Sequence, residues 1–104
     1  MNNTPLTRTV TVRNPQGLHA RPADLVVRKA TSYQSLILIG RDGELVDCKS
    51  ILSLLTLGAA QGTVLLISAD GDDAEEALDS IAQLFDAGFD DKNEMKGAEP
   101  VADM

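Results

Sequence analysis

Two hydrophobic periods alternate along this chain, and their alternation limits the possible folds more than any other feature. From Thr7 to Arg13, valines alternate with threonines, which is the two-residue period of a half-buried strand. Two later segments place apolar residues at helical spacing instead. The first stripe contains Ala20, Ala23, Val27 and Ala30, and the second contains Ala74, Ala77, Leu78, Ile81, Leu84 and Phe85. The chain therefore combines strands and helices in one small fold.

The remaining segments complete the order of elements. Apolar or alternating runs at 35–39, 44–47 and 63–68 predict three more strands, the first two joined by a hairpin turn. Ser50 is a suitable N-cap for a short helix that reaches Leu57 and ends at Gly58. The resulting order, β-α-β-β-α-β-α, predicts an α+β fold in which a four-stranded antiparallel sheet carries three helices on one face.

Length and charge indicate a single domain with an acidic end. The chain has 104 residues, 43% of them hydrophobic, and a formal net charge of −7. We expect one domain over residues 1–89 and a disordered acidic tail over residues 90–104, where the hydrophobic pattern stops. Seven basic and four acidic residues precede position 70, whereas two basic and twelve acidic residues follow from there on. The first part therefore offers a basic surface suited to acidic partners.

Composition argues against several classes of protein. Three aromatic residues and a negative charge are atypical of nucleic-acid binding. The lone Cys48 excludes an internal disulfide, and with one histidine in the chain we expect no metal site and no cofactor. The polar first eight residues lack a secretory core, and no apolar run is long enough to span a membrane. We therefore expect a cytoplasmic protein that does not insert into membranes.

The stretch from Gly17 to Ala23 carries the candidate chemistry. His19 immediately precedes a predicted helix, so the backbone N–H groups of Ala20 and Arg21 would face an anion bound there. The Arg21 guanidinium adds a charge that suits phosphate oxygens, and a neutral imidazole is a competent nucleophile. These residues predict a histidine that accepts a phosphoryl group; the alternative is an ordinary surface or capping histidine.

Three blocks carry a resemblance to a known family. The sequence Gly-Leu-His-Ala-Arg-Pro-Ala at 17–23 resembles the active-site signature of HPr, the histidine-containing phosphocarrier of the phosphoenolpyruvate-dependent sugar phosphotransferase system. Residues 49–58 resemble that family's serine-site region, and residues 61–71 its last strand and following turn. The resemblance covers Thr7 to Phe89 and implies an open-faced β-sandwich.

The resemblance also implies a phosphoryl relay. His19 would accept a phosphoryl group on Nδ1 from Enzyme I and pass it to A-type domains of sugar-specific Enzyme II, with Arg21 contacting the phosphate. Ser50 matches a regulatory serine that an HPr kinase/phosphorylase modifies in organisms that have one. The partner-docking residues would be Ile51, Leu52 and Leu55, while Leu54 and Leu57 belong to the core. The protein would act as a monomeric carrier, not as an enzyme.

Three departures and two alternatives accompany this interpretation, one departure being an acidic tail beyond Phe89 that is longer than usual in the family. Gln16 replaces a shorter residue common in the family, and Asp24 places a carboxylate near the phosphate position, where it can pair with Arg21 or Arg28. One alternative is an HPr paralogue that regulates nitrogen or carbon metabolism rather than driving sugar uptake. The other is a structural adaptor on the same fold, in which His19 is a passive cap.

Overall fold

The computed structural model describes residues 4–41 and 43–90. A single antiparallel sheet runs in the order β1-β4-β2-β3. Its strands are β1 (Leu6–Thr11), β2 (Leu36–Arg41), β3 (Glu44–Asp47) and β4 (Val64–Asp70). The longest strand, β4, therefore lies inside the sheet between the two segments that flank the first helix in sequence.

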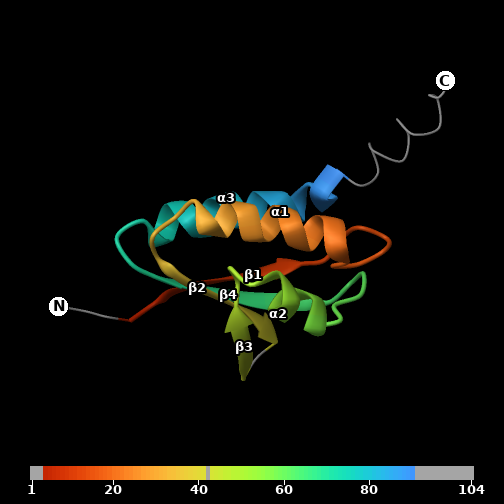
Figure 1. Cartoon of the computed structure of the whole chain (residues 1–104), viewed down its shortest axis with the longest axis horizontal. Helices are drawn as coiled ribbons and strands as arrows, with labels where there is room; N and C mark the ends of the chain where they lie inside the picture. The colour runs from red at the N-terminus through yellow and green to blue at the C-terminus, as the bar shows by residue number, and fades with distance from the viewer. Residues whose placement is uncertain (1–3, 42, 91–104) are drawn as a thin grey trace.

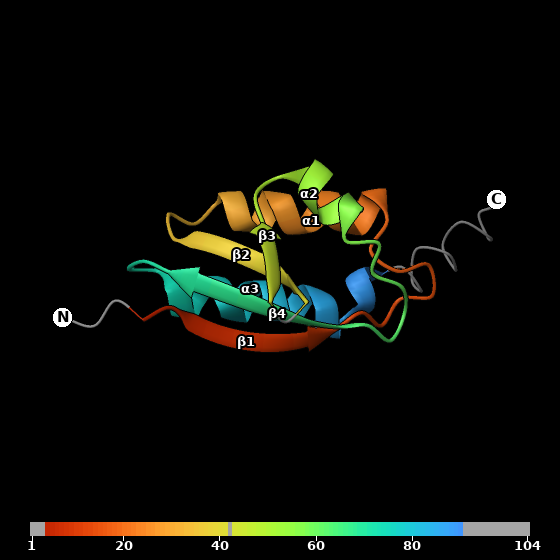
Figure 2. The same ribbon diagram turned by 90° about the horizontal axis from the view of Figure 1, so that it is seen from below.

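Three α-helices complete the predicted order of elements. They are α1 (Ala20–Thr31), α2 (Ile51–Thr56) and α3 (Ala74–Asp86), and a 3-10 turn, Gly88–Asp90, follows α3. Figure 1 shows α1 and α3 side by side over one face of the sheet, and the view from below in Figure 2 shows the strands in front of them. The shorter α2 packs against α1 and contacts β3. The observed order and the antiparallel sheet confirm the predicted α+β open-faced sandwich.

The core lies between the sheet and the two long helices. Alternate residues of β2 and β4 are fully buried there, since neighbouring strand residues point to opposite faces. These residues are Ile37, Ile39, Leu65, Ile67 and Ala69. On the opposite face, Leu36 and Val64 are each 58% exposed. The sheet is therefore covered by helices on one side only.

One helical stripe differs from its prediction. In α1 the buried positions are Pro22, Ala23, Val26 and Ala30. Ala20, which the spacing placed inside, is exposed, and Val27 is half-buried while Val26 is enclosed. The buried stripe is thus rotated by part of a turn from the predicted one, because α1 packs against both α3 and α2 rather than against the sheet alone.

An ion pair joins β1 to α3, and a cysteine lies in the core. Arg8 of β1 points to the helical side and forms an ion pair with Asp79 of α3, with Nη1 and Oδ1 2.5 Å apart. Cys48 is fully buried. Burial, with a smaller contribution from Asp47, raises the pKa of the Cys48 thiol to about 12. Cys48 is therefore a core residue whose thiol stays protonated at neutral pH.

Two sequence predictions concern the chain ends and the membrane. Residues 91–104, which form most of the predicted acidic tail, lie outside the described residues. Within the described part of the chain, no helix has the length and apolar character needed to cross a bilayer.

Asp73 links the start of α3 to the loop before β2. Its carboxylate accepts hydrogen bonds from the Gln34 N–H at 2.9 Å, the Ser35 N–H at 3.0 Å and the Ser35 hydroxyl at 2.6 Å. The Ser35 hydroxyl, followed by the backbone bond from Gln34, lowers the pKa of the Asp73 carboxyl below its ordinary value of 3.8. The ionised carboxylate is the form that the folded state favours.

This shift predicts an acid-dependent loss of stability. Because the pKa is lower in the folded state, the stabilisation by Asp73 is present above the unfolded-state value and is lost as the pH falls through the folded-state value. We expect Asp73→Asn to lower the thermal midpoint at neutral pH and to flatten its decline in acid, measured by circular dichroism. Asp72→Asn, which alters an exposed neighbouring carboxylate, should leave the decline unchanged. Parallel acid profiles for the wild type and Asp73→Asn would contradict the prediction.

Candidate functional site

His19 lies at the N-cap of α1, as the sequence predicted. Its backbone is extended, with φ −90° and ψ −167°, and its carbonyl accepts the first helical hydrogen bond from the Ala23 N–H at 2.9 Å. The half-buried imidazole makes no capping hydrogen bond to the helix. A histidine that served as a passive cap would use its side chain for that bond. The geometry therefore disfavours the capping interpretation.

The first turn of α1 contains the residues for which the sequence predicts phosphate binding. Ala20 and Arg21 occupy its first two positions, where backbone N–H groups point out of the helix end rather than toward a carbonyl of the helix. The third position is Pro22, which has no N–H to satisfy and is buried. The positive end of the helix dipole and the exposed Arg21 side chain both favour a negative group beside His19.

A close backbone approach fixes the loop that carries His19. Gly17 has φ +76°, and a Cβ atom there would lie 2.6 Å from the Ala59 carbonyl oxygen and 3.1 Å from Ala60 Cα. The next residue, Leu18, is buried and donates its N–H to the same Ala59 carbonyl at 2.9 Å. Glycine is thus required at position 17 both by its conformation and by the space available. The loop before α1 is held against the segment that follows α2.

Asn14 also holds this loop, a role that the sequence alone did not indicate. Its side chain is 2% exposed, and Nδ2 donates to the Gly17 carbonyl at 2.6 Å. The Gly17 N–H in turn donates to the Asn14 carbonyl at 3.1 Å, which closes a turn over residues 14–17. An asparagine at the start of a turn commonly binds nearby backbone in this way, so its position before Pro15 and Gly17 was the available signal.

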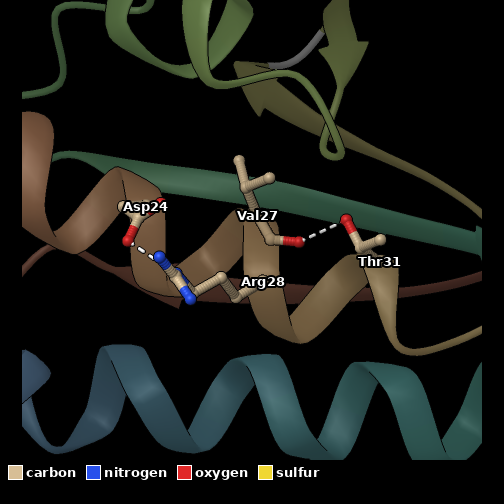
Figure 3. Close-up of polar contacts among 4 residues, drawn as sticks. All are labelled: Asp24, Val27, Arg28 and Thr31. Carbon is tan, nitrogen blue, oxygen red and sulfur yellow. Dashed lines mark hydrogen bonds and ion pairs between the residues drawn. The ribbon is translucent and has the colours of Figure 1, made fainter.

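The exposed face of α1 carries an ion pair. Arg28 Nε donates to Asp24 Oδ2 at 2.8 Å, and Figure 3 shows these two side chains pointing toward each other one helical turn apart. The Thr31 hydroxyl donates to the Val27 carbonyl at 2.7 Å near the end of the helix. The predicted pairing of Asp24 is therefore confirmed with Arg28. This pairing offsets part of the positive charge that α1 presents.

Ser50 and the apolar residues of α2 lie on the neighbouring helix. The Ser50 hydroxyl accepts a hydrogen bond from the Ser53 N–H at 3.3 Å, so the expected N-cap is observed. Leu54 is fully buried, whereas Ile51, Leu52 and Leu55 are exposed by 36%, 72% and 38%. The three predicted docking residues thus form an apolar surface on α2, which we call the α2 patch. Their role in docking and the phosphorylation of Ser50 stay predictions.

The side chains of two basic residues bind backbone carbonyls near the ends of α2 and do not extend freely into solvent. Lys49 Nζ donates to the Tyr33 carbonyl at 2.8 Å, which joins the start of α2 to the loop after α1. Arg41 Nη1 donates to the Leu57 carbonyl at 2.8 Å at the C-terminal end of α2. Each end of the helix is therefore tied to a neighbouring element by a charged hydrogen bond.

As for metals, residues 4–41 and 43–90 contain no group of three histidine, cysteine or carboxylate side chains suited to hold an ion.

Comparisons with known proteins place this histidine and its fold in a family. The family described as "PTS HPr component phosphorylation site" matches residues 6–87. The phosphocarrier protein HPr of Treponema pallidum is 38% identical over 85 residues, which are 82% of this chain and 97% of that protein. The crystal structure of HPr-C-His from Thermoanaerobacter tengcongensis is 40% identical, with a TM-score of 0.77, and the match covers 81% of this chain and 94% of that one. The chain belongs to the HPr family of the phosphotransferase system.

Two other relatives widen the range of roles within this family. The multiphosphoryl transfer protein of Haemophilus influenzae is 33% identical over 81 residues, covering 75% of this chain but only 16% of that larger protein. The solution structure of Crh, the catabolite repression HPr of Bacillus subtilis, is 41% identical, with a TM-score of 0.57, over 77% of this chain and 95% of that one. Similar domains therefore occur within larger proteins and in a protein named for catabolite repression.

The close approach at Gly17 makes a specific prediction about stability. We expect Gly17→Ala to lower the free energy of unfolding by about 2–4 kcal/mol, because the new Cβ adds a backbone clash to the strain of a positive φ. Gly58 is the matched control, since its φ is +56° and a Cβ added there would meet no neighbouring atom within 4 Å. Gly58→Ala should cost about 1 kcal/mol from conformation alone. Equal losses in urea denaturation would show that the contact with Ala59 is unimportant.

Proposed function

We propose that this chain is a phosphoryl carrier that accepts a phosphoryl group on His19 Nδ1 from the phosphohistidine of Enzyme I and passes it to an A-type domain of a sugar-specific Enzyme II. The observation that carries the proposal is the position of His19 at the N-terminus of α1, where Ala20 and Arg21 begin the helix. The family match over residues 6–87 supports the same chemistry. The setting proposed for this exchange is the cytoplasm, with the carrier acting as a monomer.

The chemical step needs little from the carrier besides geometry and charge. The Nδ1 lone pair of a neutral His19 imidazole forms a bond to phosphorus while the bond from phosphorus to the donor's histidine nitrogen breaks and its electron pair returns to that nitrogen. The N–H groups of Ala20 and Arg21 and the Arg21 guanidinium stabilise charge on the phosphoryl oxygens. The second transfer reverses these roles, so the protein is a reactant that is turned over and not a catalyst.

The first experiment is intact-mass measurement after incubation with Enzyme I, phosphoenolpyruvate and Mg²⁺. The wild type should gain one acid-labile phosphate, and His19→Ala should gain none because the accepting nitrogen is removed. Arg21→Glu keeps that nitrogen but reverses the nearby charge, so its acceptance should be slower by about tenfold or more. A fully phosphorylated His19→Ala protein, with an active Enzyme I control, would refute the proposal.

We propose further that partners dock on the α2 patch beside His19. The patch is apolar and exposed, and α2 packs directly against α1, whose first residue follows His19. Exposed apolar clusters of this kind commonly mark interaction surfaces. A partner seated on α2 and the start of α1 would bring its own histidine to His19.

Leu52→Asp tests this docking surface. Leu52 is 72% exposed, so a charge there should raise the Kd for Enzyme I by about tenfold while changing the thermal midpoint little. Leu54→Ala on the same helix is the contrasting variant, because loss of a fully buried leucine should cost about 2–5 kcal/mol of stability. Titration calorimetry and thermal melts separate the two effects. Unchanged affinity of a folded Leu52→Asp protein would move the docking surface away from α2.

A second candidate function is a regulatory one. The likeness to Crh favours it, since that protein is named for catabolite repression. In this version Ser50 receives a phosphate from an HPr kinase/phosphorylase, where about −1.5 to −2 charges at the start of α2 would repel an acidic partner from the neighbouring patch. Phosphate transfer from the wild type to A-type domains of sugar permeases favours the carrier role. Modification of Ser50 by purified kinase, without such transfer, favours the regulatory one.

A further inference from the structure

The Gly17 carbonyl receives two hydrogen bonds, one from each side of the site loop. Asn14 Nδ2 donates to this oxygen at 2.6 Å, and the backbone N–H of His19 donates to it at 2.9 Å. A carbonyl oxygen has two lone pairs and accepts both bonds. Because it cannot donate, the Asn14 amide must present Nδ2 and not Oδ1 to it, which fixes the orientation of the side chain. One oxygen therefore connects Asn14 to the backbone of His19.

The position of Asn14 makes this connection rigid. Its side chain is 2% exposed, so water does not compete for the bond to Gly17. Its carbonyl also accepts the Gly17 N–H at 3.1 Å, so that Asn14 binds Gly17 through both its side chain and its backbone. On the other side of the loop, the Ala59 carbonyl holds Leu18. Gly17 and Leu18 are thus fixed from two directions just before His19.

We propose that Asn14 is a positioning residue for phosphoryl transfer, which holds His19 at the end of α1 through the Gly17 carbonyl. This inference rests on the proposed function of His19. Transfer between two imidazoles requires the accepting nitrogen in line with the bond that breaks, and a displacement of about 1 Å in such a geometry costs up to about a hundredfold in rate. Because Asn14 is buried and acts on His19 through the Gly17 carbonyl, we expect its effect on the rate of the chemical step and not on docking.

Two variants and a matched control test the proposal. Asn14→Ala removes the side-chain bond, and Asn14→Asp keeps the shape but replaces the N–H donor with a carboxylate oxygen. Gln61→Ala is the control, because Gln61 Nε2 donates at 2.9 Å to the Arg13 carbonyl, at the base of the same loop but not at the carbonyl that binds His19. All four proteins are compared at a temperature where thermal melts show them to be folded.

The readouts separate positioning from general stability. Steady-state acceptance from phosphorylated Enzyme I should show a kcat about tenfold lower for both Asn14 variants, with KM for the carrier unchanged because α2 is intact. Hydrogen exchange of the His19 N–H should be faster by about tenfold in these variants, while Gln61→Ala should match the wild type in both measurements. Folded Asn14 variants with wild-type kcat would overturn the inference.

A measurement on the wild type covers the case in which neither Asn14 variant folds. A scalar coupling across the hydrogen bond between Asn14 Nδ2 and the Gly17 carbonyl carbon should be present by NMR before and after phosphorylation of His19. Loss of this coupling in the phosphorylated protein would overturn the positioning role. A wild type that accepts no phosphate would refute the proposed function itself, and the kinetics of the wild type distinguish that failure from a failure at Asn14.

Discussion

The close approach of Gly17 and Leu18 to Ala59 and Ala60 is the contact on which the rest of the site depends. It brings the loop that precedes α1 against the segment that follows α2, although the two are far apart in sequence. Only glycine fits at position 17, because the two backbone segments lie too close together there to admit a Cβ atom. The N-terminus of α1 and the apolar residues of α2 consequently share one rigid frame. A partner that recognises α2 would find His19 already in place.

Charged side chains in this molecule hold elements of the fold together. Arg8 pairs with Asp79 between β1 and α3, and Arg28 pairs with Asp24 along α1. Arg41 and Lys49 each donate to a backbone carbonyl beside α2. At least four of the seven basic residues before position 70 are therefore engaged within the fold.

The sequence was informative wherever structure depends on local pattern. The alternation around Val10, the helical spacing of α1 and α3 and the cap at Ser50 predicted elements within one or two residues of their observed bounds. It also placed His19 at the start of a helix, because Gly17 and Pro22 flank that start with the residues that a sharp turn and a first helical turn favour. What the pattern did not predict depends on contacts between distant segments. In α1, Val26 is buried and Ala20, which was predicted to be buried, is not. This difference follows from packing against two other helices, which the spacing of apolar residues in one helix does not reveal. The buried position of Asn14 follows from its enclosure in the loop before α1, which its sequence neighbours do not reveal.

Because α2 is short, the contacts that stabilise it can be named, and its exposed apolar residues are not among them. Helices of fewer than about 12 residues have little stability of their own. The six residues of α2 are stabilised instead by the Ser50 cap, the buried Leu54 side chain and the bond from Arg41 to the Leu57 carbonyl. None of these requires an apolar residue at Leu52 on the outer face, and a polar residue would serve the fold equally well. The proposed docking would give this apolar surface a role, and the packing of α2 against α1 would bring a bound partner toward the helix that begins after His19.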